Sequence, residues 1–347
     1  MVEEPLNLDR YVRQMRYPPL GEAGPRRLAA SRVLVCGCGA LGSMLANSLV
    51  RAGVGRVRIV DRDFVELSNL QRQVLFDEGD AAAGMPKAVA AAEKLSRINS
   101  QVRIEPLVAD VDAGNILSLC EGVDAIVDGT DNFETRFLLN DAAIHLGLPW
   151  VYGGCLGAEG QTMTILPGET ACLRCLIPQC PAPGSTPTCD TAGIVGPVVG
   201  VIASIQALEA IKILSGNRAA VSRHLVVLDL WSNQLRQIDV HDLRQQVDCP
   251  ACQHGELSWL HGKAGSSSAV LCGRNAVQLA PPAGSPIVLE ELARKLQGLG
   301  VVSVNQYLLR LKAPPYELTI FPDGRAIIGG TSDVAAARTL YAKYVGS

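Results

Sequence analysis

Residues 33–61 carry side chains and glycines that could hold a phosphate and a sugar. An apolar run at 33–36 leads into a turn that contains Gly37, Gly39 and Gly42, and leucines then recur at helical spacing. A strand, a glycine turn and a helix in this order let backbone N–H groups face an anion. A second apolar run, 57–60, ends at Asp61, whose carboxylate could accept hydrogen bonds from ribose hydroxyls. We therefore expect a bound nucleotide.

Polar and cationic side chains follow this acid. Asp63 comes two residues later, and the chain then carries Asn69, Arg72 and Lys87. The pyrophosphate bridge of a dinucleotide needs no cationic clamp. A triphosphate that loses pyrophosphate does, because charge builds on the leaving oxygens and fixed cations stabilise it. The cations thus favour ATP, whereas the glycines and Asp61 alone would fit an NAD-dependent oxidoreductase.

Two Cys-x-x-Cys pairs predict a metal site. They are Cys172 with Cys175 and Cys249 with Cys252, and their near edges lie 74 positions apart (249 − 175). Four thiolates at this spacing suit tetrahedral Zn²⁺, each pair supplying one edge of the tetrahedron. Neither pair has the context of a thioredoxin-like dithiol. With sulfur at all four positions no place remains for substrate, so we expect the zinc to stabilise the fold.

Alternating strands and helices are expected to position these residues. The strands are predicted at 33–36, 57–60, 102–107 and 124–128, and the helices at 41–52, 87–98, 113–120 and 133–146. This order predicts an α/β fold, a doubly wound, Rossmann-like and mostly parallel sheet with its ligand outside the carboxyl ends of the strands. Further elements are predicted at 150–165 (sheet), 195–214 (helix), 224–230 and 234–240 (strands).

A second, smaller domain is predicted at the C-terminal end. We assign 1–261 to the large domain with its zinc site of four cysteines, 262–268 to a Gly/Ser-rich linker and 269–347 to a small α+β domain. Its strands are expected at 269–272, 276–279, 303–311, 317–321 and 326–328, and its helices at 289–299 and 334–344. Asp323-Gly324 is typical of a hairpin turn, and Cys272 is expected to pack. The only role we assign to this domain is docking a partner.

Composition and charge indicate which partners and which cellular compartment to expect. A net charge of −3 over 347 residues gives no general attraction to nucleic acid or to an anionic membrane. The N-terminus has no apolar signal segment, and the apolar run at 192–205 is too short for a membrane span and is interrupted by glycines and Pro197, so we expect a buried helix. Eleven cysteines without a secretion signal indicate a reducing compartment, the cytosol.

These motifs together resemble the MoeB/ThiF family, the bacterial relatives of ubiquitin-activating enzymes. The resemblance covers about residues 8–255 and includes Arg10-Tyr11-Val12-Arg13-Gln14 and Asp128-Gly129-Thr130-Asp131-Asn132. It implies an ATP-dependent adenylyltransferase that activates the C-terminal carboxylate of a small ubiquitin-like sulfur-carrier protein ending in Gly-Gly. That carboxylate would attack the α-phosphate of ATP and expel pyrophosphate. No general base is needed, because the carboxylate is already ionised.

The resemblance also implies roles for single residues. The three glycines would position phosphate, Asp61 would hold the ribose beside Asp63, and Asn69, Arg72 and Lys87 would neutralise charge. Asp131 would hold Mg²⁺, although an aspartate here could also be a helix cap. Arg13 would act in the neighbouring subunit of a homodimer, although Arg10 and Arg13 could also be a solvated helix face.

Cys189 is a further candidate. It ends a proline-rich segment, 178–190, and resembles the family cysteine that can form a covalent link to the carrier protein. The link would be a thioester or a persulfide-linked adduct on the way to sulfur transfer, with a sulfur donor protein as a further partner. The alternative is a small, partly buried apolar residue, and Cys180 is a weaker candidate.

Two other functions fit parts of the sequence. A relative that adenylates a modified tRNA base would need a basic surface, which the net charge does not suggest, and it leaves the paired cysteines unexplained. A non-enzymatic scaffold is disfavoured because every charged position named above is present. The sequence does not distinguish the thiamine, molybdopterin, tRNA thiolation and cysteine pathways.

Overall fold

The computed structural model describes residues 7–181, 187, 189–264, 269–271, 275–279 and 287–345. The chain divides into two compact units, one formed by 1–181 and 192–264 and the other by 182–191 and 265–347. Of the linker predicted at 262–268, residues 265–268 lie outside the described residues, and so does Cys272.

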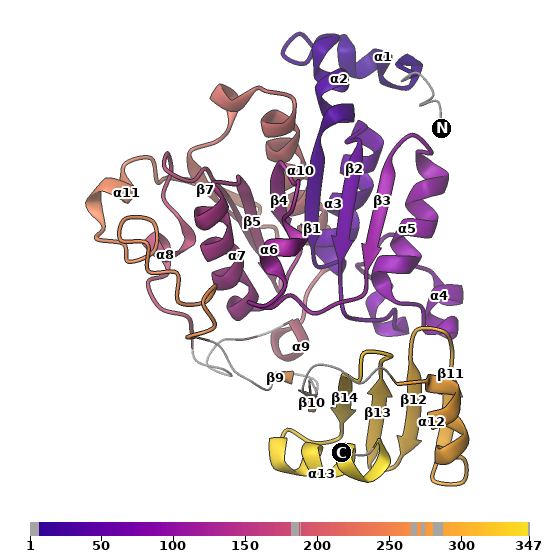
Figure 1. Cartoon of the computed structure of the whole chain (residues 1–347). Coiled ribbons are helices and arrows are strands. Elements are labelled where there is room, and N and C mark those ends of the chain that lie inside the picture. The colour runs from indigo at the N-terminus through magenta and orange to yellow at the C-terminus, as the bar shows by residue number, and fades with distance from the viewer. Residues whose placement is uncertain are drawn as a thin grey trace. The chain divides into compact units, whose positions relative to one another are not determined.

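The first unit is built on an eight-stranded sheet (Figure 1) with the order β3-β2-β1-β4-β5-β6-β7-β8. The strands are β1 (Arg32–Cys36), β2 (Arg56–Val60), β3 (Arg103–Leu107), β4 (Ala125–Asp128), β5 (Trp150–Leu156), β6 (Glu159–Ile165), β7 (His224–Asp229) and β8 (Gln234–Asp239). Strands β1 to β5 pair in parallel, and β5 to β8 pair antiparallel. The predicted Rossmann-like α/β class is confirmed, as a mixed sheet.

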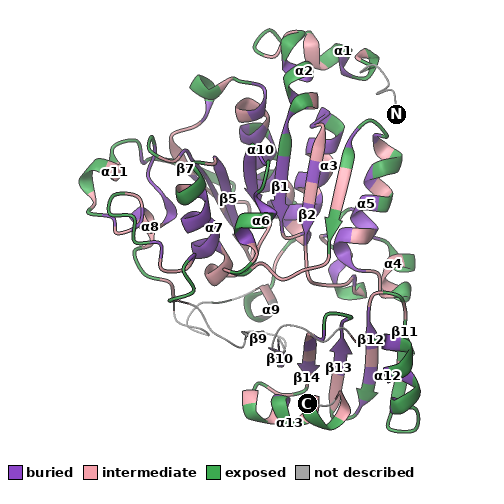
Figure 2. Ribbon diagram, in the orientation of Figure 1, coloured by how far each residue is buried: buried purple, intermediate pink, exposed green. Residues whose placement is uncertain are grey.

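Helices cover both faces of this sheet. On one face lie α3 (Ala40–Ala52), α5 (Lys87–Ile98) and α10 (Gly196–Leu214), and on the other α6 (Ile116–Leu119) and α7 (Phe133–Leu146). Figure 2 shows that the central strands are buried, and all four residues of β4 are. Continuous apolar strands of this kind are expected where helices cover both faces.

Helix α10 is apolar almost throughout, with a mean hydropathy of 1.7. In the described part of the chain it is the one helix long and apolar enough to cross a membrane, by length and composition only. It packs against α3 and against β4, β5 and β6, as a core helix does, and half of it is buried. The expected helix is therefore present and packs in the core on one side, but it is only half buried, because Val201 and Leu208 on its other side are exposed.

Short elements complete the first unit. They are η1 (Asp9–Tyr11), α1 (Val12–Met15), α2 (Ala23–Ala30), η2 (Leu67–Asn69), α4 (Glu78–Ala83), α8 (Leu173–Leu176), η3 (Arg218–Ala220) and α11 (Leu243–Gln246), and α9 (Cys189–Ala192) joins the two units in sequence. Neither α2 nor α4 was predicted. A capping-box pattern marks α4, because Asp77 and Asp80 each accept a hydrogen bond from the other's backbone N–H.

The second unit has a six-stranded antiparallel sheet with the order β11-β12-β13-β14-β10-β9. Its elements are β9 (Ala269–Leu271), β10 (Ala276–Leu279), α12 (Leu289–Leu296), β11 (Val301–Val304), β12 (Leu309–Ala313), β13 (Tyr316–Ile320), β14 (Ala326–Gly329) and α13 (Val334–Tyr344). The single strand predicted at 303–311 is wrong: Asn305 accepts backbone hydrogen bonds from Tyr307 and Leu308, and this turn separates β11 from β12.

The turn at Asp323-Gly324 joins β13 to β14, as predicted. Phe321 donates its N–H to Arg325 across it (2.9 Å), and Gly324 has a φ of 83°. Leucines of α12 and aliphatic residues of the sheet form one core, which makes this unit a small α+β fold.

Candidate functional site

The glycine turn joins β1 to α3 under tight steric limits. A Cβ on Gly42 would lie 1.8 Å from the carbonyl oxygen of Gly37, which itself has a φ of +84°. A Cβ on Gly129, after β4, would lie 2.5 Å from the same oxygen. Above Gly39 the nearest atom is Nε2 of Gln73, at 3.8 Å. A side chain at Gly42 or Gly129 would therefore clash with the backbone of the turn. Gly39, in contrast, leaves room for an approaching group.

Asp61, at the end of β2, ties this turn in place. Its Oδ2 accepts a hydrogen bond from the N–H of Cys38 (2.6 Å), and its Oδ1 accepts one from the N–H of Asp63 (2.7 Å). Burial raises the pKa of Asp61, against the attraction of Lys87. A carboxylate has about four lone-pair positions, so Asp61 retains capacity for ribose hydroxyls.

Lys87 begins α5 and is almost completely buried. Its Nζ lies 3.0 Å from Oδ2 of Asp63, and its backbone N–H donates to the carbonyl oxygen of Asp63 (2.9 Å). A bridge between Phe64 and Pro86 continues this pairing. Asp63, which we expected to contact the nucleotide, therefore positions the ammonium group in this structure.

The segment after Asp63 holds the other predicted donors. Asn69 is buried, and its Oδ1 accepts a hydrogen bond from the N–H of Glu66 (3.2 Å). Arg72 is half-buried, and its Nη1 donates to the carbonyl oxygen of Ser68 (3.1 Å). Because Gln73 reaches Gly39, this segment lies beside the glycine turn.

Asp131 is exposed in the loop between β4 and α7. The neighbouring Asn132 caps α7, because its Oδ1 accepts a hydrogen bond from the N–H of Thr135 (2.8 Å). The cap is therefore supplied by Asn132 rather than by Asp131. This leaves the carboxylate of Asp131 at the edge of the sheet where the glycine turn also lies.

A buried ion pair supports the Asp131 loop, and the sequence analysis missed it. Nε of Arg136 lies 3.6 Å from Oδ2 of Asp128, and Nη2 of Arg136 donates to the carbonyl oxygen of Thr130 (2.7 Å). Asp128 also accepts from the hydroxyl of Thr130 (2.7 Å). Burial raises the pKa of Asp128, and the attraction of Arg136 opposes that shift. The pair holds Thr130 from two sides.

The structure brings the four cysteines of the two pairs together. Their Sγ atoms lie within 4.8 Å of one another, at 3.6 Å for Cys172–Cys249, 3.8 Å for Cys172–Cys175 and 3.5 Å for Cys175–Cys252. Tetrahedral zinc with Zn–S bonds of about 2.3 Å sets its sulfurs roughly 3.8 Å apart. The hydrogen bond between Cys172 and Cys249 lowers the pKa of the Cys249 thiol. The cluster fits a closed Zn²⁺ site.

Helix α7 supports both halves of this cluster. The N–H of Leu173 donates to Oδ1 of Asn140 (2.9 Å), and the N–H of Trp259 donates to Oδ2 of Asp141 (3.0 Å). Trp259 also packs on Phe137, with ring centroids 5.5 Å apart. These contacts to polar residues in the middle of a helix gave no signal in the sequence.

Arg13 lies at the opposite end of the first unit. Beside it, Gln14 donates to the carbonyl oxygen of Ala52 (3.1 Å) and Arg10 to that of Ile98 (2.9 Å), at the C-terminal ends of α3 and α5. The glycine turn precedes the N-terminal end of α3, whose 13 residues span roughly 18 Å at about 1.5 Å per residue. The structure does not bring Arg13 to the glycine turn of its own chain.

Cys189 begins α9 and is half-buried. It belongs to the segment that clusters with the second unit. Burial raises the pKa of the other candidate, Cys180, to about 11, which disfavours a reactive thiolate there.

Comparison with known proteins identifies the family. The model of the ThiF family matches residues 11–251. The chain belongs to the ThiF family. It is 43% identical to the sulfur carrier protein ThiS adenylyltransferase of Bacillus subtilis over 338 residues, which are 97% of this chain and 99% of the relative. It is 41% identical to the sulfur carrier protein adenylyltransferase of Thermus thermophilus over 71% of this chain and 90% of the relative.

Further members have related names, and a solved structure has the same fold. The SAMP-activating enzyme E1 of Haloferax volcanii is 40% identical over 72% of this chain and 90% of the relative. The crystal structure of E. coli MccB with ATP superposes with a TM-score of 0.60 at 21% identity, over 71% of this chain and 74% of that one. The resemblance seen in the sequence is confirmed, and the Bacillus relative matches the second unit as well.

Proposed function

We propose that this protein is an ATP-dependent adenylyltransferase that activates the C-terminal glycine carboxylate of a ubiquitin-like sulfur-carrier protein. The observation that carries the proposal is the 43% identity to a ThiS adenylyltransferase across both units, in a chain with the glycine turn and the buried Lys87 described above. An NAD-dependent oxidoreductase and adenylation of a tRNA base are not favoured, because the named relatives activate sulfur carriers.

The reaction follows from an ionised nucleophile. A carboxylate oxygen of the carrier attacks the α-phosphorus of ATP, an O–P bond forms, and the bond from that phosphorus to the bridging oxygen breaks. Pyrophosphate leaves with the electron pair. Gly37, Gly39 and the start of α3 bind phosphate, while Arg72 and Lys87 stabilise the charge on the leaving group. Alignment and fixed charge are sufficient, and no general base takes part.

Asp131 fits a role in holding Mg²⁺. Its carboxylate is exposed, is not used as the helix cap and lies at the edge where phosphate is expected. A hard cation of this kind takes oxygen ligands and neutralises phosphate charge. The Asp128–Arg136 pair fixes the backbone that carries Asp131.

The four cysteines fit Zn²⁺, which stabilises the fold when bound. All four tetrahedral positions belong to sulfur, so no position is open to substrate. Thiolates of this kind persist in a reducing compartment, and we place the protein in the cytosol.

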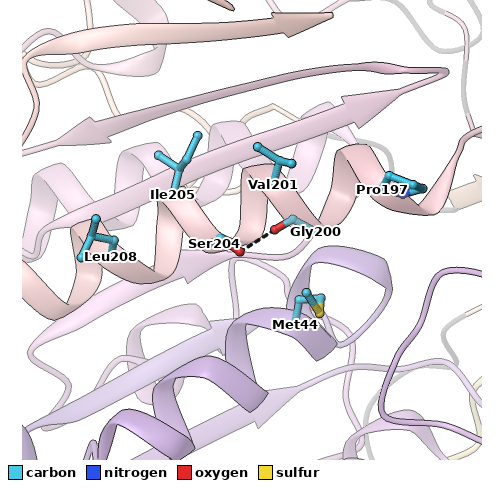
Figure 3. Close-up of a pocket in the computed structure, with 7 residues that line it drawn as sticks. All are labelled: Met44, Pro197, Gly200, Val201, Ser204, Ile205 and Leu208. Atoms are coloured by element: carbon cyan, nitrogen blue, oxygen red, sulfur yellow. Dashed lines mark hydrogen bonds between the residues drawn. The ribbon is translucent and has the colours of Figure 1, made fainter. Parts of the chain in front are cut away.

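A homodimer would explain where Arg13 acts, since its own glycine turn is out of reach. The exposed side of α10 supports such a contact. Pro197, Val201, Ile205 and Leu208 of this helix and Met44 of α3 are among the residues that line a hollow of about 520 Å³. Figure 3 shows these side chains along α10, with Met44 on the neighbouring helix. Leu208 is 52% exposed. Apolar patches of this kind mark protein contacts, and a second copy of the chain is the occupant we propose.

Cys189 is proposed to act after adenylation. Its thiolate would attack the carbonyl carbon of the acyl-adenylate and expel AMP, so that a thioester forms between Cys189 and the carrier. A sulfur donor protein would then supply the sulfur atom.

Exchange of labelled pyrophosphate into ATP tests the proposal. We expect exchange only when a carrier ending in Gly-Gly is added, because the acyl-adenylate must form before it can be reversed. A carrier that lacks its last glycine is the matched control and should give none. Exchange without any carrier, or turnover of a nicotinamide cofactor, would contradict the proposal. A pull-down for small proteins ending in Gly-Gly identifies the carrier.

A further inference from the structure

One buried side chain holds the segment that carries Arg13. We call this segment, residues 9–15, the N-terminal arm; it consists of η1 and α1. Tyr11, the last residue of η1, is 2% exposed, whereas Arg13, two residues later in α1, is exposed. The arm therefore combines a buried aromatic side chain with an exposed cation.

The Tyr11 ring lies in a slot at the C-terminal ends of α3 and α5. Gly53 follows α3 with a φ of +88°, and a Cβ on it would lie 2.5 Å from Cζ and from the phenol oxygen of Tyr11. The phenol oxygen accepts a hydrogen bond from Nδ2 of Asn99 (2.9 Å), the buried residue that follows α5. The same Nδ2 donates to the carbonyl oxygen of Val50 in α3 (2.9 Å). Both helices thus hold the ring, and glycine leaves the room for it.

Two further residues of the arm donate to the same helix ends. Nε2 of Gln14 donates to the carbonyl oxygen of Ala52 (3.1 Å), and Nη1 of Arg10 donates to that of Ile98 (2.9 Å). The last carbonyl groups of a helix have no partner within the helix and carry partial negative charge. Donors from the arm therefore satisfy them. Arg10 is exposed and Gln14 is half-buried, so Tyr11 is the buried centre of the contact.

The two helices that hold the arm also begin at the proposed nucleotide site. Helix α3 follows the glycine turn, and α5 begins with Lys87. The helices pack against each other, and their 13 and 12 residues each span roughly 18 Å at about 1.5 Å per residue. The slot therefore fixes where the arm lies relative to the phosphate-binding groups of its own chain, and with it the place from which Arg13 extends.

We propose that Tyr11 is a positioning residue, which holds the N-terminal arm in the slot of Gly53 and Asn99 so that Arg13 is presented to the nucleotide site of the neighbouring subunit. The inference rests on the proposed adenylyltransferase and its homodimer. Helix α1 has four residues, and a helix of this length is not stable by itself. Because the slot orders the arm when the chain folds, the guanidinium loses less freedom in the transition state.

Mixed dimers separate this role from a general structural one. Tyr11→Ala should lower carrier-dependent pyrophosphate exchange about tenfold, and it should add nothing to Arg13→Ala, because both changes act through one guanidinium. In a mixed dimer with Lys87→Ala, the intact site of the Tyr11→Ala chain receives the intact arm of its partner, so about a quarter of the sites should be restored. Mixing with Arg13→Ala should restore none, because every site then meets a defective arm.

A milder variant and a second readout complete the test. Tyr11→Phe keeps the ring and loses the hydrogen bond from Asn99, so exchange should fall about two- to tenfold with the same pattern in mixed dimers. Trypsin should cleave after Arg13 faster in Tyr11→Ala than in the wild-type protein, because cleavage follows the population of the released arm. Tyr17→Ala is the control: it removes an exposed tyrosine just beyond the arm and should change neither exchange nor cleavage.

Two results overturn the inference. One is no recovery when Tyr11→Ala is mixed with Lys87→Ala although Arg13→Ala recovers with the same partner, which would mean that Tyr11 supports only the fold of its own chain. The other is cleavage of the arm at the wild-type rate in Tyr11→Ala. A wild-type protein without exchange contradicts the proposed function instead, and the cleavage rates then still decide whether Tyr11 holds the arm.

Discussion

Nζ of Lys87 lies 3.0 Å from Oδ2 of Asp63, and the two side chains are only 4% and 19% exposed. Asp63 lies two residues after Asp61, the proposed ribose-binding carboxylate, and Lys87 is the first residue of α5. A buried ammonium group needs such a partner to stay charged. Asp63 therefore holds the cation at the place where phosphate is expected.

Removing the Lys87 ammonium should lower pyrophosphate exchange. We expect Lys87→Ala to reduce kcat by about 10²–10³-fold, as for loss of a fixed donor at developing charge. In Asp63→Ala the ammonium group loses its 3.0 Å ion pair and is no longer held in place, so exchange should fall in this variant as well.

The control for this experiment is Lys94→Ala. Lys94 is ion-paired with Asp77 and Asp80 outside the site, and its loss should leave exchange unchanged. Near-normal exchange in Lys87→Ala would remove Lys87 from the mechanism.

Asp131→Ala should abolish exchange at ordinary Mg²⁺ concentrations and leave the proposed dimer intact. The reason is the loss of an oxygen ligand next to the phosphates. The measurement is the exchange rate over a Mg²⁺ titration, with Asn132→Ala as the control that removes the helix cap instead. Asn132→Ala should lower stability by about 1 kcal/mol and keep the Mg²⁺ dependence. Normal Mg²⁺ dependence in Asp131→Ala would contradict the role.

Arg13 should act across a subunit boundary, since it lies at the C-terminal end of α3, away from its own glycine turn. Arg13→Ala and Lys87→Ala should each be inactive alone. Mixing them under conditions of subunit exchange should restore about a quarter of the sites, because random pairing of a dimer gives half heterodimers with one intact site. Arg16→Ala, a nearby exposed arginine, is the control. No recovery in mixed dimers would contradict action in the neighbouring subunit.

Loss of one zinc ligand should release the metal. We expect Cys172→Ser to lower the zinc content, measured by elemental analysis, and to lower Tm, because structural metal binding contributes to folding. Acid should have the same effect in the wild-type protein, since protons compete for the thiolates. Cys180→Ser, which is half-buried outside the cluster, is the control and should keep its zinc. Full zinc content in Cys172→Ser would exclude the four-cysteine site.

Cys189→Ala should leave adenylation intact. Exchange depends on alignment and charge at the nucleotide, so it should be unchanged, while a covalent adduct with the carrier should disappear from gels run without reductant. A large loss of exchange in this variant would place Cys189 in the first step rather than a later one.

The sequence by itself determined the local parts of this protein. The glycine turn, the acid after the second strand and the spacing of each cysteine pair are short-range patterns, and each depends on backbone geometry within a few residues. The predicted strand at 303–311 failed because one side chain, Asn305, folds the backbone into a turn that apolar spacing does not reveal.

Only the tertiary structure decided which of these parts meet. Lys87 and Asp63 are 24 residues apart, Tyr11 and Asn99 are 88 apart, and Cys172 and Cys249 are 77 apart. Parallel strands bring their carboxyl ends to one edge of the sheet whatever the length of chain between them. The fold also places Arg13 near the C-terminal end of α3, whereas the glycine turn precedes the N-terminal end of this helix. The spacing of residues along the sequence does not reveal this distance.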